Sequence, residues 1–167
     1  VDSLSAILGS HAPWVALTGA GISSASGIPT YRDHTGTWLG SQPIQHDEFI
    51  SEPVKRQRYW SRSALGWPRV RAAQPNASHT ALVKLEQAGL LTGVITQNVD
   101  RLHQRAGSQR VIDLHGRLDQ VKCLDCGHIT TREAIQNWIE AHNALPNTSA
   151  LQLLSLIHIS EPTRPLY

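Results

Sequence analysis

Apolar and polar positions alternate along the 167-residue chain in a way that predicts strands followed by polar turns and helices. Three short apolar runs are typical of buried strands: residues 13–18, 91–96 and 111–114. Between the first two strands a helix is expected from Pro75 to about Ala88, since its apolar residues share one face and Gly89 is a good stop signal. The order strand, helix, strand, turn, strand predicts an α/β fold with a parallel sheet, in which ligands bind where the strands end.

The remaining segments predict smaller elements around this sheet. Short helices are expected at residues 3–10, 47–51, 54–64 and 101–105, and a further strand at 118–122. Residues from about 40 to 75 show weak periodicity and are interpreted as a helical insertion outside the sheet. Thr130 and Glu133 form a capping-box pattern at the start of a helix over residues 131–150. One face of that helix is expected to carry Ile135, Trp138, Ile139 and His142.

The two ends of the chain are interpreted separately. Leu153–Tyr167 has no relation in pattern to the preceding residues and is similar to translated sequencing-adapter read-through. We interpret it as a non-native tail on a truncated chain, with an ordinary C-terminal linker as the alternative. Residues 1–12 lack a basic region followed by an apolar core, so no signal peptide is expected.

Composition and charge narrow the classes of function. Hydrophobic residues make up 40% and charged residues 17% of the chain, as in an ordinary globular protein. The net charge of +2 disfavours direct binding to nucleic acid or to a membrane surface, and no apolar run is long enough to span a bilayer. Both cysteines lie in one Cys-x-x-Cys, which indicates a reducing compartment, so the cytoplasm is expected.

The first strand runs directly into a glycine-rich turn, Thr18-Gly19-Ala20-Gly21. Glycines in such a turn accept positive φ and let a phosphate approach the backbone N–H groups at the start of the next helix. The usual dinucleotide pattern needs a third glycine where Ser24 stands, so a tight turn without a ligand is the alternative. The loop 27–33 adds a proline, a tyrosine and an arginine, and can fold over a bound nucleotide.

A polar cluster, Gln97-Asn98-Val99-Asp100, follows the second strand, and His115 follows the third. Since parallel strands end at one edge of a sheet, these side chains are expected near the glycine turn. For the cluster, the structural alternative is a loop start in which Asp100 caps the next helix. His115 is a candidate general base because imidazole titrates near neutral pH, and a hydrogen-bonded strand-end histidine is its alternative. His103 and His79 are expected to pack against or cap their helices.

Six motifs occur in order along the chain: Gly19–Ser23, Gly27–Pro29, Tyr31-Arg32, Thr96–Asp100, Leu114–Gly116 and Cys123-x-x-Cys126. In this order and rough spacing they resemble the sirtuins, the NAD-dependent protein deacylases of the Sir2 type. The likeness covers about residues 1–145, and Pro43–His46, Arg56–Trp60 and Gly66–Pro68 are most similar to the class II branch. It implies a partial Rossmann-like sheet over residues 1–117 with helices on both faces, and half of a small zinc-binding module over residues 118–130.

The resemblance also implies a reaction. In sirtuins the carbonyl oxygen of an acyl-lysine attacks the nicotinamide ribose of NAD, which releases nicotinamide and leads to O-acyl-ADP-ribose. His115 is then implied as the general base, and Asn98 and Asp100 as residues that act with it. The implied NAD contacts are Gly19, Ala20, Gly21, Ile22, Pro29, Tyr31, Arg32, Asp33, Gln97, Asn98, Val99 and Asp100. The expected partner is an acyl-lysine protein substrate, and for a eukaryotic source the mitochondrial matrix replaces the cytoplasm.

Tyr59 and Arg62 have the Tyr-x-x-Arg spacing that resembles the acyl-recognition pair of sirtuins that prefer acidic acyl groups. An arginine offers a bidentate match to a carboxylate, so an acidic acyl group is one expectation. The alternative is an ordinary solvated helix face, to which the neighbouring arginines also belong.

Cys123 and Cys126 have the spacing of a metal knuckle, but a structural zinc needs four ligands and the chain has no other cysteine. The resemblance implies Zn²⁺ with a second cysteine pair supplied further along the protein. His128 as a third ligand and a redox role for the two thiols are the alternatives. The family's later segments are also missing from the sequence, so we expect this chain by itself to be inactive.

Three other functions stay open at this point. A mono-ADP-ribosyltransferase uses the same kind of site and cannot be separated by sequence. An oxidoreductase that uses NAD as a hydride carrier predicts the third loop glycine, which Ser24 replaces. A non-catalytic module that binds NAD and zinc predicts nucleotide binding without turnover.

Overall fold

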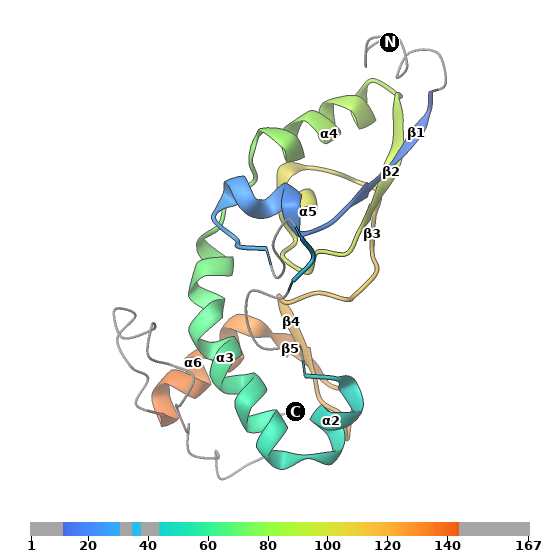
Figure 1. Cartoon of the computed structure of the whole chain (residues 1–167). Coiled ribbons are helices and arrows are strands. Elements are labelled where there is room, and N and C mark those ends of the chain that lie inside the picture. Colours follow the sequence, from blue (N-terminus) through green and yellow to red (C-terminus); the bar gives the residue numbers. More distant parts are fainter. Residues whose placement is uncertain (1–11, 31–34, 38–43, 144–167) are drawn as a thin grey trace. The chain divides into compact units, whose positions relative to one another are not determined.

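The computed structural model describes residues 12–30, 35–37 and 44–143 (Figure 1). The chain divides into two compact units, one formed by residues 1–39 and 72–118 and the other by residues 40–71 and 119–167. The expected helix at 3–10, the expected tail at 153–167 and the loop 31–33 lie outside the described residues. In the described ranges, no helix combines the length and the apolar character that crossing a membrane requires.

The first unit is built on a parallel sheet in the order β1-β2-β3. Its strands are β1 (Trp14–Thr18), β2 (Leu91–Thr96) and β3 (Val111–Asp113). Thr18 pairs with Thr96, which pairs in turn with Asp113, so the three strands end at the same level. The parallel α/β sheet expected from the sequence is therefore confirmed, and all its strand ends meet at one edge.

The helices of this unit are α4 (Ala77–Gln87) and α5 (Leu102–Ala106). Asn76 caps α4 because its side chain accepts the N–H of Ser78 at 2.9 Å, and Gly89 ends the helix with φ of +72°. The helix α4 packs against β2 and α5. The most deeply buried apolar side chains of this layer are Val83, Leu91, Val94 and Leu102.

The two faces of the sheet differ sharply. Thr18 and Asp113 hydrogen-bond to side chains of α5, which places that helix on their face of the sheet. The alternate positions point to the opposite face and are largely exposed: Val15 55%, Leu17 69% and Ile112 59%. In the part of the chain that the structure describes, the helices α4 and α5 lie on one side of the sheet (Figure 1).

The second unit contains three helices and a hairpin. These are α2 (His46–Ser51), α3 (Pro53–Ala72), β4 (Gln120–Lys122), β5 (Ile129–Thr131) and α6 (Arg132–His142). The hairpin β4-β5 is antiparallel. Ala64 of α3 and Ile139 of α6 form the buried centre, with Trp60, Ile135 and Trp138 packed around them. Apolar burial between α3 and α6 therefore holds this unit together.

Two sequence expectations about this unit are wrong in detail. The helix expected at 54–64 continues to Ala72 even though Gly66 and Pro68 disfavour it. Tertiary contacts outweigh that local cost, because Glu133 accepts hydrogen bonds from Trp67 Nε1 and from Arg71. The strand β5 was not expected at all.

The start of α6 also differs from the capping-box prediction. Thr131, not Thr130, is the N-cap, and its Oγ1 accepts the N–H of Ala134 at 3.2 Å. Thr130 is occupied in the hairpin, where it pairs with Val121. The apolar face of the helix is confirmed except at His142, which is exposed and stacks on Trp138 with ring centroids 4.3 Å apart.

Candidate nucleotide site at the strand ends

The glycine turn joins β1 to a short 3-10 helix, η1 (Ala20–Ser26). Gly27 ends η1 in the left-handed region with φ of +83°, where its N–H reaches back to Ser23 and Ser24. The sequence argument expected positive φ earlier, but Gly19 has φ of −144°. A Cβ on Gly21 would meet no atom within 4 Å, and one on Gly19 would meet only Gln97 Oε1 at 3.9 Å. The backbone of the turn is thus open to close approach by a ligand.

Asn98, two residues beyond β2, connects the two strand ends. Its side chain is buried, and its Nδ2 donates to the carbonyl of Gly19 and to Ser23 Oγ, each at 3.0 Å. Its backbone N–H donates to Thr96 Oγ1 at 3.1 Å. Both amide protons of the side chain are therefore used to hold the glycine turn against β2.

Asp100 completes the same arrangement. Ser23 Oγ donates to Asp100 Oδ2 at 2.6 Å, and the N–H of Leu102 donates to Asp100 Oδ1 at 2.9 Å. The carboxylate therefore binds both the turn and the first residue of α5, although the N-cap position is Arg101 and not Asp100 as the structural alternative expected. We call the three side chains Ser23, Asn98 and Asp100 the strand-end clasp.

Ser23 was missed as a site residue by the sequence reasoning. It is 1% exposed and bonds to both other members of the clasp. The sequence did offer one signal for Ser23, its type and position. A hydroxyl side chain two residues after Gly21 can accept and donate hydrogen bonds at once. Sequence periodicity could not reveal its partners, because they lie 75 and 77 residues away.

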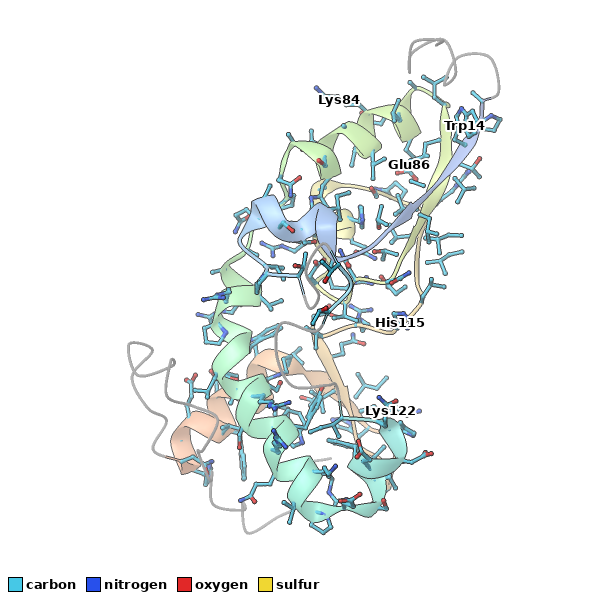
Figure 2. All side chains as sticks on the ribbon, in the orientation of Figure 1. Trp14, Lys84, Glu86, His115 and Lys122 are labelled. Carbon is cyan, nitrogen blue, oxygen red and sulfur yellow. The ribbon has the colours of Figure 1, made fainter. Side chains whose placement is uncertain are left out.

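His115 leaves the sheet beside the clasp. The N–H of Leu114 donates to the carbonyl of Thr96 at 2.9 Å, and the N–H of Leu118 donates to the carbonyl of Val99 at 2.9 Å. The segment that carries His115 therefore runs along the backbone of the polar cluster. The imidazole itself is exposed and lies just beyond β3 (Figure 2).

Of six further residues of the expected site, the structure describes three. Gln97 is exposed beside Gly19, and its N–H extends the ladder by donating to Thr18 at 3.0 Å. The carbonyl of Ile22 accepts Asn76 Nδ2 at 2.8 Å. Pro29 is exposed. Tyr31, Arg32 and Asp33 lie outside the described residues.

The two other histidines behave as expected from their helices. His79 and His103 are 0% and 1% exposed, so both are packing residues. His79 Nδ1 accepts the N–H of Asn76 at 3.3 Å and so supports the start of α4. Burial lowers the pKa of both imidazoles, which keeps them neutral.

The cysteines form a tight turn between β4 and β5. The N–H of Cys126 points at Cys123 Sγ at 3.5 Å, and this backbone contact is the main cause that lowers the pKa of the Cys123 thiol. The N–H of Cys123 donates to the carbonyl of His128 at 2.8 Å. Both thiols are free, and the described residues contain no group of three or more metal-binding side chains. The turn therefore presents two neighbouring thiols, whereas a structural zinc site needs four ligands.

Tyr59 and Arg62 lie one turn apart on α3. The Tyr59 ring is 37% exposed and packs edge-on against Phe49 at 5.1 Å and Trp60 at 5.5 Å. Partial burial and the neighbouring Arg58 lower the pKa of Arg62. The two side chains therefore share a helix surface in the second unit.

These features define a parallel α/β protein with an open glycine turn and a polar clasp at its strand ends. The chain belongs to the Sir2 family, whose model matches residues 19–156. It is similar to NAD-dependent protein deacetylase 3 of Pseudomonas syringae pv. tomato, with 55% identity over 130 residues that cover 78% of this chain and 46% of that protein. It is also similar to the NAD-dependent protein deacylase SIR4 of Monosiga brevicollis, with 51% identity over 99% of this chain and 51% of that protein.

A solved Sir2 complex with a p53 peptide and NAD+ shares the fold. It has a TM-score of 0.67 and 40% identity, and the likeness covers 82% of this chain and 54% of that one. The chain thus spans about half the length of the curated relatives it matches. Family and fold are shown by these matches.

Proposed function

We propose that the protein to which this chain belongs is an NAD-dependent protein lysine deacylase. The observation that carries the proposal is the strand-end clasp, which joins an open glycine turn to the polar cluster in a member of the Sir2 family. The names of the relatives and the NAD complex of a Sir2 structure support the same activity.

The residues present suit NAD. The open backbone at Gly19 and Gly21 suits a pyrophosphate, since no Cβ blocks the N–H groups. Asn98, Val99 and Asp100 are proposed to contact the carboxamide and ribose, and Gln97 the ribose hydroxyls. Ile22, Pro29, Tyr31, Arg32 and Asp33 complete the proposed contacts. NAD supplies an electrophilic ribose carbon with nicotinamide as its leaving group.

His115 is proposed as the general base. An exposed imidazole on the segment that borders the polar cluster can take a proton from a ribose hydroxyl, and histidine is the side chain that most often does this in enzymes. Asn98 and Asp100 are proposed to hold the reacting sugar in place for it. Because both are already bonded to Ser23, their orientation is set before a ligand arrives.

The remaining proposals concern metal, substrate and compartment. Cys123 and Cys126 are proposed to hold a structural zinc together with two ligands from outside this chain, because two thiols alone do not complete the site. An acyl-lysine protein is the proposed substrate, and Tyr59 and Arg62 the proposed contacts for an acidic acyl group. The two free thiols support the cytoplasm as the compartment.

The test uses a chimera, because the chain spans about half of its relatives. This chain replaces the matched stretch of the Pseudomonas relative, and nicotinamide release from NAD is measured with an acetyl-lysine peptide. We expect turnover that His115→Ala lowers by about 10²–10⁴-fold and that the exposed control His46→Ala leaves unchanged.

Other outcomes would contradict the proposal. Reduction of NAD without nicotinamide release indicates an oxidoreductase. NAD binding that persists without turnover, and that His115→Ala does not alter, indicates a binding module. Transfer of ADP-ribose to protein in place of deacylation indicates a mono-ADP-ribosyltransferase.

A further inference from the structure

Two buried imidazoles lie behind the strand ends without a role in the proposed reaction. The rings of His79 on α4 and His103 on α5 are in contact, with centroids 4.9 Å apart and planes tilted by 56°. Each ring has one hydrogen-bonded nitrogen. In the described part of the chain, the other nitrogen of each, His79 Nε2 and His103 Nδ1, is buried without a partner. A buried polar atom without a partner is costly, so the pair needs an explanation.

The protonation state of His79 follows from its neighbour. A backbone N–H can only donate, and the N–H of Asn76 points at His79 Nδ1 at 3.3 Å. Nδ1 must therefore carry a lone pair. In the neutral ring the proton then sits on Nε2, which makes the unpartnered atom of His79 a donor.

The state of His103 follows from two threonines. Thr18 Oγ1 donates its single proton to Thr96 Oγ1 at 2.9 Å, and His103 Nε2 lies 2.9 Å from the same Thr18 oxygen. With the threonine proton used, His103 Nε2 must be the donor to Thr18. The neutral ring then has its lone pair on Nδ1, so the unpartnered atom of His103 is an acceptor.

The leftover donor of one ring and the leftover acceptor of the other are complementary. We propose that His79 and His103 are positioning residues that act as one pair of neutral Nε2–H imidazoles in ring contact, in which the Nε2–H dipole of His79 attracts the Nδ1 lone pair of His103 without a hydrogen bond between them. Hydrogen bonds run from Asn76 to His79 on one side of the pair and from His103 through Thr18 to Thr96 on the other, and the ring contact joins them into what we call the relay. The relay ends at the residue whose Oγ1 also accepts the N–H of Asn98.

This relay holds the glycine turn from both ends. At one end it fixes the hydroxyl of Thr18, the residue directly before Gly19. At the other end Asn76, whose N–H begins the relay, donates through Nδ2 to the carbonyl of Ile22 at 2.8 Å and to Ser26 Oγ at 2.9 Å. The relay therefore sets the turn that faces the proposed nucleotide.

Charge determines when the relay can form. Protonation of His79 would put a proton on Nδ1, where it would face the N–H of Asn76. Protonation of His103 would put a proton on its Nδ1, where it would face the Nε2–H of His79. Both arrangements bring two donors together. Burial is the main cause that lowers the pKa of both rings, and His79 lowers that of His103 further. Asp100 in the loop after β2 faces both rings and favours protonation, as does Asp113 of β3 for His103. Burial outweighs the two carboxylates, so the relay is intact at neutral pH and is lost on acidification.

The first experiment needs no activity. Long-range ¹H–¹⁵N spectra of the labelled 167-residue chain at pH 7.5 report the tautomer of each imidazole. We expect both His79 and His103 as neutral Nε2–H tautomers, with titration midpoints below 6.5. A His103 ring with its proton on Nδ1, or either ring charged at pH 7.5, would overturn the proposal.

The second experiment uses the threonine link. Thr18→Val removes the acceptor for His103 Nε2, so we expect mixed tautomers at His103 and about tenfold weaker NAD binding by calorimetry. Thr18→Ser restores the hydroxyl and is expected to restore the single tautomer, and the exposed control Thr92→Val is expected to change neither measurement. Loss of the single tautomer in Thr18→Ser, or its retention in Thr18→Val, overturns the relay.

The effect on NAD rests on the proposed function, but the tautomers do not. If the wild-type chain shows the expected tautomers and binds no NAD, the relay stands, and the chimera decides the proposed function separately. If NAD binds and the tautomers differ, the relay fails alone. The wild-type spectra decide the matter even if Thr18→Val does not fold.

Discussion

The strand ends of the first unit were expected to bind a nucleotide, and the cysteine turn of the second unit was expected to bind zinc. The two regions differ in how many of the required side chains the described residues bring together. At the strand ends, Ser23, Asn98 and Asp100 satisfy one another and the backbone around them. At the turn, Cys123 and Cys126 offer two thiols and find no third ligand among the described residues.

The difference shows how each site is stabilised. The clasp is part of the fold of this unit, because its hydrogen bonds join β1, β2 and α5 over separations of more than 70 residues. The cysteine turn is local, since its contacts span residues 123–128. Damage to the clasp should therefore reduce stability, whereas damage to the turn should have little effect until a metal and further ligands are present.

The largest stability effect is expected from Asn98→Ala. This change removes two hydrogen bonds of the side chain and takes away one of the donors to the carbonyl of Gly19. We expect the free energy of unfolding to fall by about 2 kcal/mol, measured by urea denaturation. The exposed neighbour Gln97→Ala is the control and should cost less than about 0.5 kcal/mol. Equal losses for the two variants would show that the clasp does not stabilise the unit.

Acidification should weaken the first unit next. The pKa of His79 and of His103 is lowered on folding, so the unfolded chain takes up protons below about pH 6.5 that the folded chain does not. Stability is therefore full above pH 6.5 and falls as the pH drops below it, by at most about 1.4 kcal/mol per pH unit for each proton.

Urea denaturation at three pH values measures how the free energy of unfolding changes with pH. The values are about 7.5, 6.5 and 5.5, which bracket the ordinary histidine pKa. His103→Gln should make the slope shallower, and His46→Gln on the exposed start of α2 should not. A slope that is unchanged in His103→Gln would show that other groups cause the pH dependence.

A smaller effect is expected at the cap of α6. Thr131→Ala removes the side chain that accepts the N–H of Ala134 and should lower the free energy of unfolding by about 1 kcal/mol. Thr130→Ala should cost less, because that hydroxyl does not cap the helix. The reverse order would favour the capping box predicted from the sequence, and circular dichroism during denaturation measures both.

The smallest effect is expected at the cysteine turn. In metal-free buffer, Cys123→Ser should change the free energy of unfolding by less than about 0.5 kcal/mol, since the contact from the N–H of Cys126 to the thiol is long, at 3.5 Å. Elemental analysis of the purified chain should find zinc well below one ion per chain. One tightly held zinc per monomer would show that this chain supplies the missing ligands.

Much of the framework followed from the sequence by itself. The apolar runs at 14–18 and 91–96 form neighbouring strands, as their pattern predicts, although Val15 and Leu17 of the first strand are largely exposed. The polar cluster after β2 and the glycine turn after β1 were placed together for a similar reason, because parallel strands end at one edge.

Tertiary structure alone decided the connections between those parts. The role of Ser23, the length of α3 beyond Pro68 and the contact between His79 and His103 all depend on partners that are distant in sequence. Local pattern reports periodicity and propensity over a few residues, whereas a hydrogen-bond partner is set by how whole elements pack. For that reason the sequence located the site, and packing determined which of its side chains hold one another.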